Sequence, residues 1–260
     1  MVQRKFKLKT KQVIVPICDL RLKPKSNSNL ETQFLFGENI KIINEEQKSW
    51  LLCQSIEDNY TGYIKKENLG DLKTINYKIT SLSCFIYKKP NIKSSIVTKL
   101  FLNSKISASK TEPNWFSVFF KNKKYFIYHK DLNSINKYAN SSWVDLSIKF
   151  LNTPYLWGGK SHLGLDCSAL VQLAFQSVNK KFPRNTIDQF RSNILKTVSE
   201  KELDKGTLIF WKGHVAIAIN KTEIIHSNAF HMKVAIEKFH EAKLRIENSY
   251  GQILGFKKLI

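Results

Sequence analysis

The chain has 260 residues and a formal net charge of +21 at pH 7, with 42% hydrophobic and 12% aromatic residues. This apolar content excludes a disordered polymer and is enough for two or three small domains, each with its own core. The apolar runs are far shorter than the roughly 18–20 residues that cross a membrane, so we expect no membrane partner. The apolar run before Cys18 is too short for a secretory signal, and we expect a cytoplasmic protein, or a periplasmic one if a signal has been removed.

The positive charge raises the question of nucleic-acid binding. Lysines are distributed along the whole chain, however, and neither an RNP1 pattern nor a zinc-finger spacing is present. We therefore expect no nucleic-acid partner. A basic surface that raises the encounter rate with an anionic substrate fits the composition better.

The four cysteines are widely spaced and include no CxxC pair. We expect free thiols, because a disulfide framework is unusual in a chain of this length without a signal peptide. Three of them, Cys18, Cys53 and Cys84, are expected to be small buried hydrophobic residues.

Two consecutive segments in the first half of the chain are similar to each other. Pro24 precedes Trp50 by 26 residues, and Pro90 precedes Trp115 by 25. Each Trp begins a strand-like run, "WLLCQSI" and "WFSVFF", and a second aromatic run follows each, "GYIKKENL" and "YFIYHKDL". Short β-rich segments separated by polar turns predict two copies of one small barrel.

These segments resemble bacterial SH3-like (SH3b) domains. "DLRLKPKS" and "TGYI" fit the family pattern in the first copy. The second copy is degenerate, because "FIYKKPN" lacks the Arg and "YFIY" lacks the Gly. The resemblance implies recognition of cell-wall material or, in multi-domain peptidases, a contribution to the active site. We place the two SH3-like domains at residues 1–70 and 71–135.

The hydrophobic pattern changes after the polar joint "NSINKYANSS". Ser142 is a candidate helix N-cap, Val144, Ile148 and Leu151 recur at helical spacing, and Pro154 is expected to end the helix. A second helix is predicted from "CSALVQLAFQSV", and strands from "GTLIFW", "HVAIAI", "TEIIHS", "KVAIEKF" and "GQILGFKKLI". Helices followed by consecutive strands predict an α+β domain with an antiparallel sheet over residues 136–260.

Cys167 begins the second predicted helix, directly after the glycine-rich turn "WGGKSHLGLD". A helix N-terminus lowers the pKa of a thiol and favours the nucleophilic thiolate. A lone cysteine at a helix start is nevertheless more often structural, so a nucleophile requires a nearby base.

Two histidines are candidates for the base and its orienting partner. His214 begins one predicted strand and His226 ends the next; a hairpin would bring their side chains together, so that His226 orients the imidazole of His214. A metal site of His214, His226 and His231 is the alternative. It has no clear fourth ligand and leaves Cys167 unused, so we expect neither metal nor cofactor.

"NTPYLWGGKSHLGLDCSALVQLAF" resembles the signature of the NlpC/P60 cysteine peptidases, as do "FPRNTIDQF" and "KGTLIFWKGHVAIAINKTEIIHS". The resemblance implies a papain-like α+β catalytic domain. It makes Cys167 the nucleophile, His214 the general base and then acid, and His226 the orienting residue. The chain departs from the family pattern at Ala169, Thr207 and Ala216.

NlpC/P60 enzymes with SH3b domains resemble γ-D-glutamyl-L-diamino-acid endopeptidases, which cut between D-Glu and meso-diaminopimelate or Lys in peptidoglycan stem peptides. The resemblance implies a peptidoglycan-derived peptide with a free N-terminal L-Ala, used in cell-wall recycling. Its amine would be bound by Asp166, Ser168 and an aromatic residue of the first barrel, for which Tyr60 is the candidate and Tyr63 the rival. Substrate binding is also assigned to Trp157 and to Tyr155, whose hydroxyl is a candidate oxyanion donor.

Two alternatives remain at this stage. The paired SH3-like domains would also suit a wall-binding protein with an inactive catalytic domain. An exported autolysin that acts on the intact wall is the other.

Overall fold

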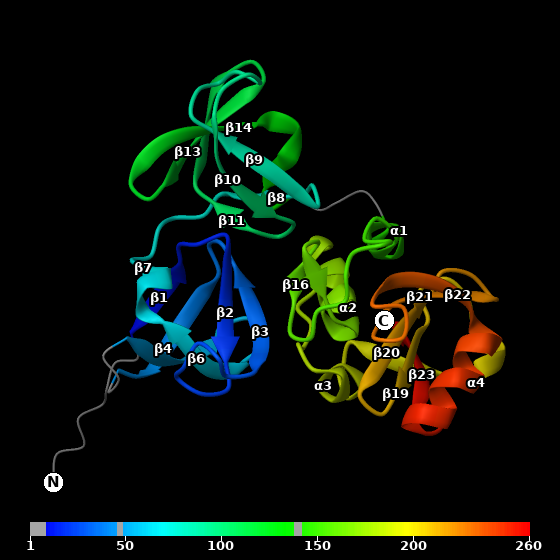
Figure 1. Cartoon of the computed structure of the whole chain (residues 1–260). Coiled ribbons are helices and arrows are strands. Elements are labelled where there is room, and N and C mark those ends of the chain that lie inside the picture. The colour runs from blue at the N-terminus through cyan, green and yellow to red at the C-terminus, as the bar shows by residue number, and fades with distance from the viewer. Residues whose placement is uncertain (1–8, 46–48, 138–141) are drawn as a thin grey trace, which may run out of the picture. The chain divides into compact units, whose positions relative to one another are not determined.

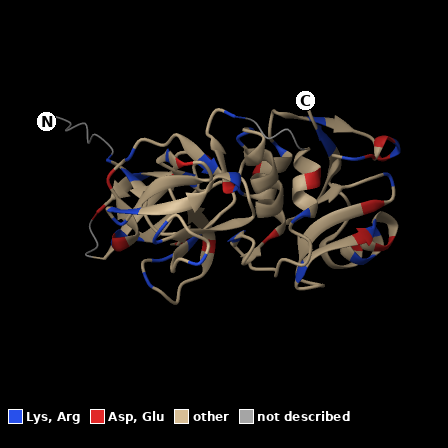
Figure 2. Ribbon diagram, turned by 90° about the horizontal axis from the view of Figure 1, so that it is seen from above, with Lys and Arg blue, Asp and Glu red and all other residues tan. Residues whose placement is uncertain are grey.

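The computed structural model describes residues 9–45, 49–137 and 142–260. The chain divides into two compact units, residues 1–137 and 138–260 (Figure 1). Within the described part of the chain, no helix combines the length and the apolar character needed to cross a membrane. Figure 2 shows Lys and Arg distributed over the strands and loops of both units.

The first unit begins with a seven-stranded antiparallel sheet in the order β3-β2-β6-β5-β4-β1-β7. Alternate side chains of its strands point into one core, as the alternating burial along "WLLCQS" shows. Cys18 and Cys53 are fully buried in that core and carry free thiols. The elements are β1 (Thr10–Val13), β2 (Ile17–Arg21), β3 (Leu30–Leu35), β4 (Asn39–Asn44), β5 (Trp50–Ser55), β6 (Thr61–Lys65), the 3-10 turn η1 (Lys66–Asn68) and β7 (Leu69–Gly70).

The second half of this unit repeats the pattern with a five-stranded sheet, β10-β9-β14-β13-β12, and a three-stranded sheet, β11-β8-β15. Trp50 begins β5 and Trp115 begins β13, and each of these strands pairs with the next strand along the chain. Cys84 lies in the second core. The elements are β8 (Tyr77–Ile79), β9 (Ser83–Tyr87), β10 (Ile96–Phe101), β11 (Lys105–Ile106), β12 (Ala108–Glu112), β13 (Trp115–Phe120), β14 (Lys123–Tyr128), the 3-10 turn η2 (His129–Asp131) and β15 (Leu132–Ser134).

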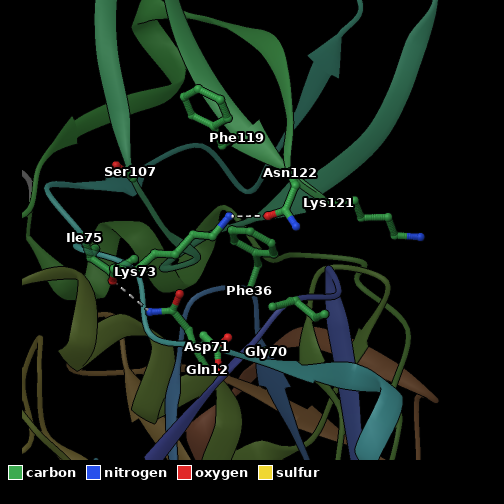
Figure 3. A pocket seen from close by; sticks show the side chains of 11 residues that line it. Gln12, Phe36, Gly70, Asp71, Lys73, Ile75, Ser107, Phe119, Lys121 and Asn122 are labelled. Atoms are coloured by element: carbon green, nitrogen blue, oxygen red, sulfur yellow. Dashed lines mark hydrogen bonds between the residues drawn. The ribbon is translucent and has the colours of Figure 1, made fainter.

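The two barrels of this unit touch where Gly37 meets Lys105. The N–H of Lys105 donates to the carbonyl of Phe36 at 2.8 Å, and Gly37 has a φ of +82°. A cavity of about 270 Å³ lies close by, between the barrels (Figure 3). Its lining includes no cysteine or histidine: Gln12, Ile14, Phe36, Gly70, Asp71, Lys73, Ile75, Ser107, Phe119, Lys121 and Asn122.

We predict that Gly37→Ala destabilises the first unit by about 2 kcal/mol or more. A Cβ on Gly37 would lie 2.0 Å from the carbonyl oxygen of Lys105, and the left-handed backbone adds about 1–2 kcal/mol of strain. Urea unfolding measures the loss. Gly206→Ala is the matched control, because Gly206 also has a positive φ but its Cβ would meet nothing closer than 3.5 Å. Equal losses in the two variants would contradict the close-contact explanation.

The second unit is built on a six-stranded antiparallel sheet in the order β18-β23-β19-β20-β21-β22. Figure 1 shows α2 and α4 on opposite sides of this sheet. The helices are α1 (Trp143–Ile148), α2 (Cys167–Ser177), α3 (Thr186–Phe190) and α4 (Phe239–Tyr250). The remaining elements are β16 (Lys160–Ser161), β17 (Gly164–Leu165), β18 (Leu195–Val198), the 3-10 turn η3 (Glu200–Glu202), β19 (Leu208–Trp211), β20 (His214–Ala218), β21 (Glu223–Asn228), β22 (Lys233–Lys238) and β23 (Gly255–Leu259).

The first helix of this unit is shorter than predicted. Ser142 caps it by accepting a hydrogen bond from the N–H of Val144 at 3.2 Å, but it ends at Ile148 rather than at Pro154. The chain then turns through Asn152, whose φ is +66°. Leu151 lies beyond the end of the helix and is 40% exposed, so its prediction as a helical position was wrong.

The consecutive strands of the sequence prediction are interrupted by α4, which was not predicted. Phe239, Ala242 and Ile246 are its buried residues, at helical spacing on one face. They pack with Ala216 and Ile224 of the sheet. Part of the polar joint, residues 138–141, lies outside the described residues.

Candidate active site

Asp166 and Cys167 form the beginning of α2. The Asp166 side chain caps the helix by accepting a hydrogen bond from the N–H of Ala169 at 2.9 Å. It also accepts one from the N–H of Gly158 in the glycine-rich turn, at 2.9 Å. Cys167 is therefore fixed in the first helical turn, where backbone N–H groups have no partner within the helix.

A buried arginine holds this cap in place. Arg184 donates to both carboxylate oxygens of Asp166, at 2.9 and 2.7 Å, and to the hydroxyl of Ser168 at 2.7 Å. The Arg184 side chain is 3% exposed and that of Asp166 10% exposed. Ser168 donates in turn to Asp166 at 3.1 Å. The two residues predicted to bind a substrate amine thus form one buried network with an arginine.

The thiol of Cys167 lies against the start of β20. Its sulfur is 3.9 Å from the carbonyl oxygen of Gly213. Burial raises the pKa of the Cys167 thiol to about 11, and the charge of Asp166 adds to the rise, whereas the N–H of Val215 and the hydroxyl of Thr186 oppose it. The nucleophile candidate therefore contacts the backbone on both sides of His214.

The two histidines lie side by side on neighbouring strands. Nε2 of His214 is 2.8 Å from Nδ1 of His226. The register of β20 and β21 pairs Ile217 with Ile225 and Ala218 with Ile224, so His214 and His226 are diagonal neighbours on one face of the sheet. The predicted hairpin does bring the two side chains together.

Burial sets the protonation of this pair. Desolvation is the main cause that lowers the pKa of His214 well below its ordinary value, and it also lowers the pKa of His226. With the thiol pKa raised, the resting pair of Cys167 and His214 is a neutral thiol and a neutral imidazole. A thiolate is formed by proton transfer to His214 rather than held at rest.

The predicted aromatic contacts differ in their surroundings. Tyr155 lies near the thiol, and burial raises its pKa to about 12, with a further contribution from Cys167. Trp157 is 66% exposed. Tyr60 belongs to the first unit, where its hydroxyl donates to Glu31 at 3.0 Å and its ring packs on the barrel core. Substrate binding by these residues stays a prediction.

Segments of both units match known protein families. Residues 152–247 match the NlpC/P60 family, and residues 20–69 match the bacterial dipeptidyl-peptidase SH3 domain. The chain is 24% identical over 251 residues to dipeptidyl-peptidase 6 of Lysinibacillus sphaericus, an alignment that covers 88% of this chain and 91% of that protein. It is 28% identical over 233 residues to the γ-D-glutamyl-L-lysine dipeptidyl-peptidase of Bacillus subtilis, covering 80% and 76%.

The catalytic unit therefore contains a domain of the NlpC/P60 family. The protein is an NlpC/P60 cysteine peptidase with an N-terminal bacterial SH3-like domain. The crystal structure of an NlpC/P60 family protein from Bacillus cereus shares the fold, with a TM-score of 0.80 at 19% identity over 96% of this chain and 99% of the other. The predicted multi-domain class, a β-rich SH3-like region followed by an α+β catalytic domain with an antiparallel sheet, is confirmed.

One group of side chains in the NlpC/P60 domain has the ligand types of a metal site. His226, His231 and Glu237 place one ligand atom each within 4.8 Å of one another. Arg245 occupies both carboxylate oxygens of Glu237, at 2.6 and 2.8 Å. A guanidinium in that position opposes a second cation, so the donor set fits a hydrogen-bonded network better than a metal.

Two features of the site were missed by the sequence analysis. Arg184 lies in "FPRNTIDQF", which was recognised as part of the family pattern without a role for its arginine. Glu237, next to His226, belongs to a strand whose sequence carries no motif. A buried partner for Asp166 could have been inferred from charge, because an unpaired buried carboxylate is unfavourable.

We predict that Arg184→Met lowers the free energy of unfolding of the catalytic unit by about 3–5 kcal/mol, because it leaves the charge of Asp166 buried without its partner. Urea unfolding measures the change. Lys205→Met is the control: Lys205 pairs with Asp145 at 2.5 Å, but both side chains are about half exposed, and its loss should cost less than about 1 kcal/mol. A similarly small loss in Arg184→Met would contradict the buried ion pair.

The pH dependence of cleavage should report the lowered pKa of His214. The base works only when neutral, and burial disfavours its protonated form, so activity persists to lower pH than for an ordinary histidine. We expect the acid half-maximum of kcat/KM below 6.5, the ordinary value. Samples returned from each pH to neutrality control for unfolding. A half-maximum at pH 7 or above would contradict the effect of burial.

Proposed function

We propose that this peptidase hydrolyses the γ-D-glutamyl bond to L-lysine or meso-diaminopimelate in peptidoglycan stem peptides that carry a free N-terminal L-Ala. The observation that supports it most is the position of Cys167 at the start of α2, beside His214 and His226. Nε2 of His214 lies 2.8 Å from Nδ1 of His226. The relatives aligned over most of the chain, which are named as dipeptidyl-peptidases, support the choice of bond.

The geometry accounts for acylation. Nε2 of His214 is engaged with His226, which leaves Nδ1 as the ring nitrogen that takes the proton of the Cys167 thiol. The thiolate attacks the γ-glutamyl carbonyl carbon, and the backbone N–H of Cys167 at the helix N-terminus stabilises the oxyanion. His214 then returns the proton to the leaving amine of the diamino acid, and a thioester remains on Cys167.

Deacylation uses the same groups in reverse. His214 takes a proton from water, and the resulting hydroxide adds to the thioester carbonyl. The carbon–sulfur bond breaks, His214 gives the proton to the sulfur, and L-Ala-γ-D-Glu leaves with a γ-carboxylic acid group that then loses its proton to the solvent. Each acid–base step in this scheme is carried by His214, and no metal takes part.

Recognition of the free amine is the finer part of the proposal. The carboxylate of Asp166 is already bonded to Arg184, Gly158 and Ala169. An ammonium group would therefore join a network that carries an arginine charge, so its binding needs further acceptors. A peptide whose amine is blocked tests this requirement directly.

The decisive experiment compares L-Ala-γ-D-Glu-L-Lys with the same peptide acylated at its N-terminus, followed by mass spectrometry; the meso-diaminopimelate peptides form a second pair. We expect cleavage of the free peptides and at least a hundredfold slower cleavage of the acylated ones. Cys167→Ala should abolish both reactions, because it removes the nucleophile. Cys53→Ala, a buried cysteine of the first barrel, controls for the loss of a thiol elsewhere.

The other outcomes separate the alternatives. Equal cleavage of free and acylated peptides, with clearance of purified sacculi, would favour a hydrolase of the intact wall. Retention on sacculi without cleavage of any peptide would favour a binding protein. Activity that resists iodoacetamide but is abolished by EDTA would replace the thiol mechanism with a metal-dependent one.

A further inference from the structure

A carboxylate lies behind the histidine pair, on the opposite side of His226 from His214. Oε1 of Glu237 is 2.5 Å from Nε2 of His226. In the register of β21 and β22, His226 pairs with Ala235 and Ile224 pairs with Glu237. Glu237 is therefore a diagonal neighbour of His226, just as His226 is of His214. Three adjacent strands thus carry a continuous row of His214, His226 and Glu237 on one face.

Glu237 is ionised at every pH at which the enzyme would work. Burial by itself would raise the pKa of this carboxyl, but the hydrogen bonds from His226 and Arg245 outweigh it and hold the pKa at about 2. An ionised carboxylate has lone pairs and no proton, so it can only accept hydrogen bonds.

Because the Glu237 carboxylate can only accept hydrogen bonds, it determines which ring nitrogen of each histidine carries the hydrogen. Nε2 of His226 must carry a hydrogen to bond to Glu237, so Nδ1 of the neutral ring is an acceptor. Nε2 of His214 must then be the donor across the 2.8 Å contact. The hydrogen of the His214 ring is on Nε2, and the lone pair is on Nδ1.

We propose that Glu237, held by Arg245, is a positioning residue that fixes the tautomers of His226 and His214 and keeps Nδ1 of His214 free as the base for Cys167. The hydrogen bonds of its carboxylate are with His226 and Arg245. Its effect reaches the base, His214, through two hydrogen bonds, in the way that a carboxylate orients an imidazole in other triads.

Arg245 fixes the carboxylate in turn. Its Nη2 donates to both oxygens of Glu237, and its guanidinium carbon lies 4.2 Å from the centroid of the Phe230 ring. This arrangement attaches β22 to α4 at the end of the row. His231 also faces the carboxylate, with Nδ1 3.5 Å from Oε1, but that nitrogen lies closer to Oδ1 of Asn228, at 3.1 Å.

The charges of Glu237 and Arg245 have opposite effects on the protonated form of His214. When His214 receives the thiol proton, the negative charge of Glu237 stabilises the imidazolium, whereas the charge of Arg245 destabilises it. Among the described residues, His226 and His231 also face Glu237. Removal of the Glu237 charge leaves Arg245 alone, so it makes the imidazolium–thiolate pair less favourable.

The test uses Glu237→Gln and Glu237→Asp in the full chain. Glu223→Gln is the matched control, because Glu223 lies on β21 and pairs with Lys238 at 2.9 Å, away from the row.

The first readout is the ring ¹⁵N chemical shifts of the histidines, which are assigned with the variants His214→Asn and His226→Asn. The second is the rate of Cys167 alkylation by iodoacetamide against pH. The inference rests on the thiol chemistry of the proposed function, but neither readout needs a peptide substrate, so failure of the proposed substrate is seen separately.

In the wild type we expect hydrogen on Nε2 of both histidines. Glu237→Gln should produce a population of His226 with hydrogen on Nδ1, because the amide nitrogen can donate to Nε2. Alkylation at pH 7 should slow about tenfold, the equivalent of one pKa unit. Glu237→Asp keeps the charge on a shorter side chain, so its alkylation rate should lie between those of the wild type and Glu237→Gln. The rate of Glu223→Gln should match that of the wild type.

Hydrogen on Nδ1 of His226 in the wild type would overturn the proposal. So would unchanged tautomers and alkylation in Glu237→Gln. If Glu237 served stability alone, its variants would lower the melting temperature but leave the tautomers and the pH dependence of the remaining folded enzyme unchanged. Thermal unfolding of each variant makes that comparison.

Discussion

The buried ion pair between Asp166 and Arg184 is the interaction on which the catalytic unit depends. Asp166 is at once the N-cap of α2, an acceptor for the glycine-rich turn and the partner of a buried cation. Two charges are removed from water at this point, a cost that is recovered only through complete hydrogen bonding. The network meets that condition, and it fixes the residue that follows Asp166, which is Cys167.

The site has one part that fixes the position of the thiol and another part that sets the protonation of the base. The position of the thiol is determined by backbone hydrogen bonds and by a buried ion pair. The base belongs to a row of three side chains whose proton positions depend on one another. Burial favours neutral Cys167 and His214, and the carboxylate of Glu237 partly compensates by favouring the charged imidazole. The enzyme can therefore keep an unreactive thiol at rest and still form a nucleophile during the reaction.

Much of this could be predicted from the sequence, and the remainder could not for identifiable reasons. Cys167, His214 and His226 were found because each lies in a short local pattern, and the SH3-like repeat was found because its spacing recurs. Glu237 was not found, because a diagonal contact between strands depends on register, which local sequence does not specify. The helix α4 was missed although Phe239, Ala242 and Ile246 have helical spacing, since charged residues between them obscured the pattern.

The row of His214, His226 and Glu237 has a consequence for the assembly of the enzyme. Side chains alternate between the two faces of a sheet, so a slip of one residue in β20, β21 or β22 would turn a member of the row to the opposite face. A sheet with such a slip would contain no complete row and therefore no correctly oriented general base. Catalytic competence in this protein thus requires all three strands to be in their final alignment. Cleavage activity is therefore a stricter report of native structure than compactness or secondary-structure content.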